Sequence, residues 1–219
     1  MAAERALRAA ALIGVVLALG CATRGPVNPV LVTAAQGRGA LATSDALEAL
    51  IAEGRDTPAD REYAYEFVSR QEEEGAAYAF ARAAVTGRLV QARGLLGASL
   101  VGDIEKWAQR SRELDPAFRD GAATRMLGTL YVIAPASFLK HGDSEQGLAL
   151  LEGVTREYPN AVENHLRLAE AYVALGDPAP AQPELCVCLA GRSALRRDDQ
   201  RLLDELVETA GAPDCVAGR

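Results

Sequence analysis

The stretch Leu127-Gly128-Thr129-Leu130-Tyr131 has a near copy further along the chain, Leu168-Ala169-Glu170-Ala171-Tyr172. After each pentapeptide, a small residue is followed by apolar residues four and seven positions later: Gly147, Leu151 and Val154, then Ala181, Leu185 and Cys188. Residues at these offsets share one face of a helix. The pattern therefore predicts two successive helix-turn-helix units whose helices pack in antiparallel pairs.

This spacing is typical of tetratricopeptide repeats, which stack helix pairs into a curved superhelix that binds other molecules. The leucines that begin the two pentapeptides are 41 residues apart, whereas the usual period is about 34. The excess falls between Tyr131 and Gly147. The sequence thus predicts an all-α fold in which antiparallel helix pairs stack as a tetratricopeptide-like superhelix.

The composition of the 219-residue chain agrees with an all-α fold and disfavours one class of partner. Hydrophobic residues make up 49% of the chain, many of them alanine, and aromatic residues only 5%, which favours helices over sheets. The formal net charge is −7. Because nucleic-acid binding needs a basic face, no nucleic acid is expected as a partner.

The N-terminus reads as a targeting segment. Arg5 and Arg8 precede a twelve-residue uncharged run over residues 9–20, which is shorter than the roughly 20 residues of a membrane-spanning helix but suits a signal peptide. The run ends in Leu17-Ala18-Leu19-Gly20-Cys21, which resembles the bacterial lipobox. That resemblance implies cleavage before Cys21 and lipidation of its sulfur; an ordinary signal peptide or an anchor helix is the alternative.

The expected domain organisation follows from this start. Residues 1–20 are the lipoprotein signal peptide, 21–42 a flexible tether rich in Pro, Gly and small residues, 43–210 the helical domain, and 211–219 a C-terminal tail. We expect the protein to be lipid-anchored in the bacterial cell envelope and to face the periplasm. Ala22, where inner-membrane lipoproteins carry Asp, favours the outer membrane over the inner one.

Three cysteines remain after Cys21. Because an exported protein meets an oxidising compartment, Cys215 can form a disulfide with Cys186 or with Cys188. Cys188 also occupies a core position of the repeat, so a buried thiol is an equal alternative there. Without a nearby histidine the three form a poor zinc site, and no metal is expected.

Motifs of enzymatic chemistry are sparse. The chain has two histidines, His141 and His165, and lacks a Gly-x-Ser-x-Gly, a Gly-Lys-Ser/Thr phosphate loop and a His-Glu-x-x-His motif. Gly142-Asp143-Ser144 is better explained as the cap of a repeat helix. We therefore expect a non-enzymatic protein without a cofactor.

The first helix of each tetratricopeptide pair lines the concave face, which places Arg125, Thr129, Glu163 and Glu170 there as candidate ligand- or partner-binding residues. Arg125 in a mainly apolar groove has the geometry to hold a carboxylate bidentately. The alternative is a structural ion pair between Arg125 and Glu163 or Glu170.

The insertion over residues 134–140 supplies one more candidate, Phe138. Pro135 breaks the preceding helix, so Phe138 and Leu139 fall in a loop. Exposed apolar loop residues often contact a partner or a membrane; the alternative is that they fold back as a plug between repeats.

The run from Leu114-Asp115-Pro116 through Asp120-Gly121-Ala122 to Ala134-Pro135 resembles the T component of tripartite ATP-independent periplasmic (TRAP) transporters, the TatT family. Tyr158-Pro159 and Glu163-Asn164-His165 extend the likeness, which covers about residues 43–210. The chain departs from the family at His141-Gly142-Asp143, where two glycines are expected, and at Cys186 and Cys188.

This resemblance implies a lipid-anchored periplasmic accessory protein of TRAP-type solute uptake. Its partner would be the periplasmic solute-binding protein (P subunit), and an apolar channel or cleft would take a small hydrophobic or organic-acid ligand. The alternative is a tetratricopeptide scaffold lipoprotein for protein–protein interaction in outer-envelope assembly. The sequence leaves open whether copies of the chain form a homo-oligomer.

Overall fold

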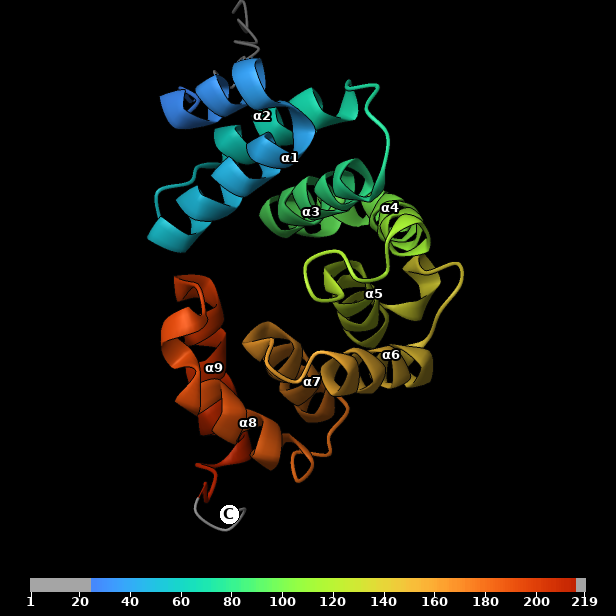
Figure 1. Ribbon diagram of the computed structural model, residues 1–219, viewed down its shortest axis with the longest axis vertical. Coiled ribbons are helices and arrows are strands. Elements are labelled where there is room, and N and C mark those ends of the chain that lie inside the picture. The colour runs from blue at the N-terminus through green and yellow to red at the C-terminus, as the bar shows by residue number, and fades with distance from the viewer. Residues whose placement is uncertain (1–24, 216–219) are drawn as a thin grey trace, which may run out of the picture.

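The computed structural model describes residues 25–215, and within them the chain forms helices and no strands (Figure 1). Cys21 and the predicted signal peptide lie outside these residues. The described α-helices are α1 (Pro29–Glu53), α2 (Pro58–Ser69), α3 (Ala76–Arg93), α4 (Val101–Leu114), α5 (Ala122–Ile133), α6 (Ser144–Glu157), α7 (Val162–Ala174), α8 (Ala181–Ala190) and α9 (Arg197–Ala210). Three short 3₁₀ helices join them: η1 (Gly94–Leu100), η2 (Ala136–Phe138) and η3 (Arg192–Ala194).

The helices stack as consecutive pairs. α3 packs on α4, α5 on α6 and α7 on α8, while α1 contacts α3 and α5 contacts α7 (Figure 1). The first helices of the pairs thus form an inner layer and the second helices an outer layer. The predicted all-α, tetratricopeptide-like stack of antiparallel pairs is confirmed.

The two pentapeptides form cores, as the repeat pattern predicts. Leu127 and Tyr131 of α5 are buried, and so are Leu168 and Ala169 of α7. The helices of the α5–α6 pair approach closely because both carry a glycine at the crossing. A Cβ atom added to Gly147 would lie only 2.8 Å from the carbonyl oxygen of Gly128.

The flexible tether predicted over residues 21–42 is wrong for residues 29–42, which belong to the folded domain. Asn28 caps α1 by accepting a hydrogen bond from the amide of Val30 (3.1 Å), and Pro29 occupies the first turn. Leu31 is fully buried, so the small residues around it serve helix packing. Residue 43, the expected start of the helical domain, lies inside α1 and is buried.

Gly39 divides α1 into two segments. Its φ of 79° lies in the left-handed region that favours glycine. The second segment is capped from a distance, because the amide of Ala40 donates to Oε1 of Glu73 at 2.8 Å. Pro29 and Gly39 therefore mark a helix start and a turn, which composition alone does not distinguish from a tether.

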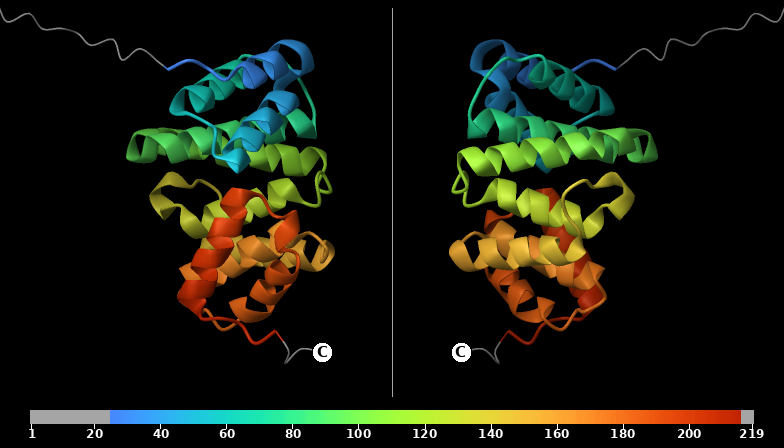
Figure 2. Two further views of the ribbon diagram at one scale, coloured as in Figure 1. Left: turned by 90° about the vertical axis from the view of Figure 1, so that its left-hand side faces the viewer. Right: turned by 90° about the vertical axis from the view of Figure 1, so that its right-hand side faces the viewer.

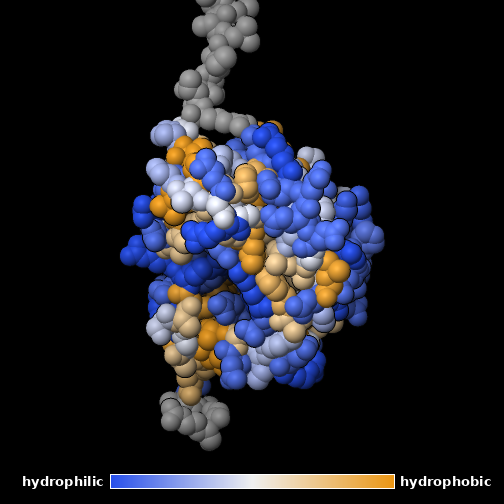
Figure 3. All heavy atoms as spheres, turned by 45° about the horizontal axis from the view of Figure 1, so that its top comes forward, coloured by the Kyte–Doolittle hydropathy of each residue, from blue (hydrophilic) through white to orange (hydrophobic). Residues whose placement is uncertain are grey.

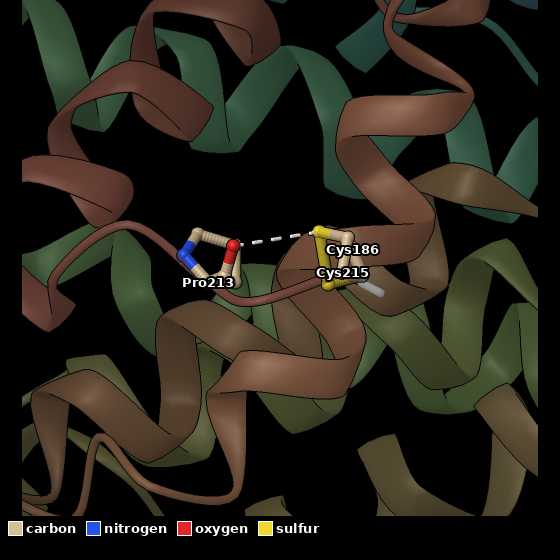
Figure 4. Close-up of a disulfide and its surroundings, with 3 residues drawn as sticks. All are labelled: Cys186, Pro213 and Cys215. Atoms are coloured by element: carbon tan, nitrogen blue, oxygen red, sulfur yellow. Dashed lines mark hydrogen bonds between the residues drawn. A yellow bond between two sulfur atoms is a disulfide. The ribbon is translucent and has the colours of Figure 1, made fainter. Parts of the chain in front are cut away.

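The C-terminal tail is tied to the domain by a disulfide. Cys186 of α8 is bonded to Cys215, and Cys188 is a buried free thiol (Figure 4). Burial raises the pKa of the Cys188 thiol to about 12, which keeps it protonated. Of the alternatives that the sequence left open, the structure selects the Cys186–Cys215 pair.

Within residues 25–215, none of the helices combines the length and the apolar character required to cross a bilayer.

Candidate binding surface on the inner helices

The last helix closes the superhelix on itself. α9 packs against α7 and α8 and also reaches α1, so that the first and last helices meet (Figure 1). The contact is made by ionised side chains from α1, α3, α7 and the start of α9, which we call the closing network: Glu48, Arg88, Arg167, Glu170, Arg196, Asp198 and Asp199.

Two arginines join α1 to α9. Arg88 holds Glu48 through two hydrogen bonds of 2.7 and 2.5 Å and contacts Asp198 at 3.2 Å. Arg196 pairs with Glu48 and, at 3.2 Å, with Asp199. Burial would raise the pKa of Glu48, but the two guanidinium groups outweigh burial and lower it, so Glu48 stays ionised.

A third arginine extends the closing network to α7. Arg167 donates to Asp199 at 2.5 Å and to Glu170 at 2.8 Å. Three arginines thus face four carboxylates, which makes the network as a whole slightly anionic. Sequence reasoning identified Glu170 but missed the other members, because their partners are far apart in the chain.

Arg125 lies on α5 and has a different partner from those predicted. Its Nη1 donates to Oδ1 of the fully buried Asn164 at 2.5 Å, and the structure shows no ion pair with Glu163 or Glu170. Burial lowers the pKa of Arg125, and the nearby Glu163 carboxylate opposes this shift only in part. The alternative of a structural Arg125–glutamate ion pair is therefore wrong for the described residues.

The remaining candidates lie in two places. Thr129 is one turn beyond Arg125, and its buried hydroxyl has no hydrogen-bond partner among the described residues. Phe138 lies apart from these residues on η2 and is 38% exposed. The structure therefore gathers Arg125, Thr129 and Glu163 on the inner helices, places Glu170 in the closing network, and separates Phe138 from them.

The inserted segment is held by a buried carboxylate that sequence reasoning missed. Glu105 of α4 is 1% exposed, and its two oxygens accept hydrogen bonds from the backbone amides of Lys140 (2.9 Å) and His141 (2.8 Å). Leu139 packs against the core around Leu127, while Phe138 stays at the surface. The sequence signal for this role is a glutamate directly after Ile104, on the buried face of α4. The plug alternative is thus confirmed for Leu139, whereas Phe138 is exposed and its contact with a partner or a membrane stays a prediction.

A pocket of about 300 Å³ opens where the end of α1 meets α9. Its lining includes Arg192, Arg197, Gln200, Arg201 and Asp204, and strongly hydrophilic side chains gather across this part of the surface (Figure 3). Arg192 is paired with Asp204 at 2.5 and 2.8 Å. With one carboxylate among three guanidinium groups, the pocket is suited to an anionic group.

His165 makes the stability of the stack depend on pH. Its Nδ1 lies 2.5 Å from the carboxylate of Glu184 and its Nε2 lies 2.8 Å from the carbonyl oxygen of Pro159. The hydrogen bond to Glu184 is the main cause of a raised His165 pKa, because both acceptors favour the doubly protonated ring.

We expect the stabilisation from His165 to be complete below its ordinary pKa of about 6.5 and to be lost as the pH rises through the raised value. Denaturant unfolding of the wild type and of His165→Asn between about pH 5.5 and pH 9 measures this. All other titratable groups are present in both proteins, so their contributions to the pH dependence cancel in the difference. The advantage of the wild type should shrink with rising pH. A constant difference would contradict the assignment.

Comparison with known families agrees with the architecture. A family model described as a tetratricopeptide repeat matches residues 138–185, which run from the end of η2 through α6 and α7 into α8. No curated protein matches the chain. The fold and this match define an all-α protein with a tetratricopeptide-like repeat, a class whose members generally serve as scaffolds for protein interactions.

Proposed function

We propose that this protein is a non-enzymatic scaffold that binds another protein of the bacterial cell envelope. The observation that carries the proposal is the stack of helix pairs with a tetratricopeptide match over residues 138–185. Attachment through a lipid on Cys21, in a periplasm-facing position and at the outer membrane rather than the inner one, is part of the proposal. The lipobox-like sequence and Ala22 support that part.

The arginine-lined pocket between α1 and α9 is the contact that we assign to the partner. Arg125, the earlier candidate, is half-buried and donates to Asn164, whereas Arg197 and Arg201 are exposed in the pocket. The planar guanidinium group matches carboxylates bidentately. An acidic segment of the partner is therefore the expected occupant.

A second candidate partner is the solute-binding subunit of a TRAP-type transporter. The quoted run from Leu114 to Pro135 and the lipobox support this role. The charged inner layer, with its closing network, gives no support to an apolar cleft for a hydrophobic ligand. The identity of the partner therefore discriminates between this role and a scaffold for outer-envelope assembly.

The test is photo-crosslinking of the full chain in cells, with benzoylphenylalanine at Arg201 in the pocket or at Glu208 in the last turn of α9. We expect an adduct from position 201 and not from 208. Arg197→Glu should weaken it about tenfold or more, because one charge reversal places like charges in contact. Arg110→Glu, on the exposed surface of α4, is the matched control.

Mass spectrometry of the adduct then names the partner. A solute-binding protein would support the TRAP role, another envelope protein the scaffold role, and a second copy of the chain a homo-oligomer in place of either. An adduct that Arg197→Glu leaves unchanged would show that the pocket is not the contact.

A further inference from the structure

Two adjacent leucines project from the junction of α3 and α4. Leu95 is 90% exposed and Leu96 is 87% exposed, far more than any other large hydrophobic residue of the described chain. They lie in η1 between Gly94 and Gly97. Leucines exposed to this degree add nothing to the core, and adjacent exposed apolar side chains commonly mark a contact with a partner or a membrane.

The two glycines hold the leucines outward. Gly94 ends α3 with a φ of 55°, in the left-handed region. Gly97 is buried against α3, where an added Cβ would lie only 2.9 Å from the Cα of Val90. The turn is therefore tight and packed at its base, while Leu95 and Leu96 point away from the body.

Phe138 lies near the start of α4, the end of that helix that follows Leu95 and Leu96. A Cβ added to Gly102, at the start of α4, would be 3.5 Å from Cε of Lys140, and Glu105 holds the backbone just beyond Phe138. We call Leu95, Leu96 and Phe138 together the apolar tip. Figure 2 shows the end of the α3–α4 pair projecting from the side of the molecule where the described chain starts.

A short path of contacts connects the chain entry to the apolar tip. The amide of Asn28 donates to Oδ1 of Asp60 at 2.7 Å, in the first turn of α2. Glu62, half a turn further on, holds Arg93 through two hydrogen bonds of 2.8 and 2.6 Å. Arg93 directly precedes η1. The segment before residue 28 therefore enters on the same side of the molecule as the apolar tip (Figure 2).

The sequence of that segment identifies the occupant. Residues 9–20 are uncharged and mostly apolar, and Asn28 lies eight positions after Gly20. A chain of that length spans at most about 28 Å. A membrane that holds the uncharged run, or a lipid on Cys21, therefore lies within reach of the apolar tip.

We propose that the apolar tip is a membrane contact: Leu95 and Leu96, with Phe138 beside them, insert into the bilayer that holds the N-terminus. The choice of occupant rests on the proposed anchoring of the N-terminal segment. The charged residues that flank the apolar tip in the sequence carry both signs, Arg93 and Lys140 against Asp103 and Asp143. The contact is therefore apolar and needs no anionic lipid.

The test measures how deeply the apolar tip enters the bilayer and not whether the chain binds a vesicle. The uncharged N-terminal run is itself expected to hold the chain on a vesicle. Full chains carrying Cys21→Ser and either Leu96→Trp or Leu114→Trp are mixed with phosphatidylcholine vesicles containing brominated acyl chains. Leu114 is 42% exposed at the opposite end of α4 and is the matched control. The chain with Trp107 alone gives the baseline.

We expect bromine to quench the added tryptophan of Leu96→Trp at least about threefold more strongly than that of Leu114→Trp, with little change on raising the salt. Leu95→Asp in the Leu96→Trp chain should abolish the difference without changing thermal unfolding, since Leu95 is 90% exposed and adds nothing to the core. Equal quenching at the two positions would overturn the proposal. So would a concentration-dependent blue shift of the Leu96→Trp chain without lipid, which would assign the tip to a contact between copies. Neither result bears on the pocket crosslink, so the two proposals fail separately.

Discussion

Arg88→Met is expected to lower the free energy of unfolding by about 3 kcal/mol, the range measured when one partner of a buried ion pair is removed. Arg88, Glu48 and Asp198 retain only 15%, 20% and 18% of their side-chain exposure. The substitution keeps the aliphatic volume but removes one of the two cations shared by Glu48 and Asp198, so that Arg196 alone remains between them. Urea unfolding with unchanged slope would measure the loss.

Arg192→Met is the matched control for this experiment. Arg192 and Asp204 have the same two-bond geometry, at 2.5 and 2.8 Å, but their side chains are 39% and 59% exposed. Exposed pairs contribute only about 0–1 kcal/mol, because water and salt screen them. If both variants cost the same small amount, the closing network does not hold α9 against α1.

Gly147→Ala is the second large effect that we expect, a loss of about 3 kcal/mol. The new methyl group would lie 2.8 Å from both the carbonyl oxygen of Gly128 and the Cβ of Tyr131. Since two helix backbones cannot separate locally without losing the contacts around them, overpacking of this kind costs about 1–3 kcal/mol and occasionally more. Thermal or urea unfolding measures it.

Gly153→Ala, on the same helix, provides the control of opposite sign. Nothing lies within 4 Å of a Cβ at Gly153, so the change adds only helix propensity, about 0.8–1 kcal/mol of stabilisation. If both alanine substitutions shift the free energy of unfolding in the same direction, α5 and α6 do not cross at Gly128 and Gly147.

The sequence predicted the parts of the fold that depend on local periodicity. Leu127, Tyr131 and Leu168 are buried as the repeat spacing requires, because a helical period of 3.6 places such residues on one face whatever the rest of the chain does. Reasoning from composition failed at residues 29–42. Small residues, Pro29 and Gly39 are equally typical of a tether and of a tightly packed, kinked helix, and only the packing of Leu31 distinguishes them.

The candidate site was predicted in part, for a related reason. Arg125 and Glu163 were placed correctly on the inner helices, but Arg125 donates to Asn164, which the concave positions of the repeat do not include. Glu105 appeared as one more charge of an amphipathic helix, although its carboxylate holds the inserted segment. Several hydrogen-bond acceptors lie at similar distances from Arg125 along the sequence. Which of them it contacts depends on the relative rotation of the neighbouring helices, which the sequence does not show.

The spacing of residues along the chain was enough to predict the helix class, the repeat register and the paired packing of α5 through α8, because these follow from spacing within one or two turns. The closure of the stack depends instead on the three-dimensional arrangement of all the helix pairs. Glu48 and Arg196 are 148 residues apart, and their meeting depends on the small rotation that each helix pair adds to the superhelix. The same accumulated rotation sets the arginine-lined pocket between α1 and α9, while the packing of α2 against α3 places the chain entry on the same side of the molecule as Leu95 and Leu96. No local residue pattern encodes the sum of these rotations.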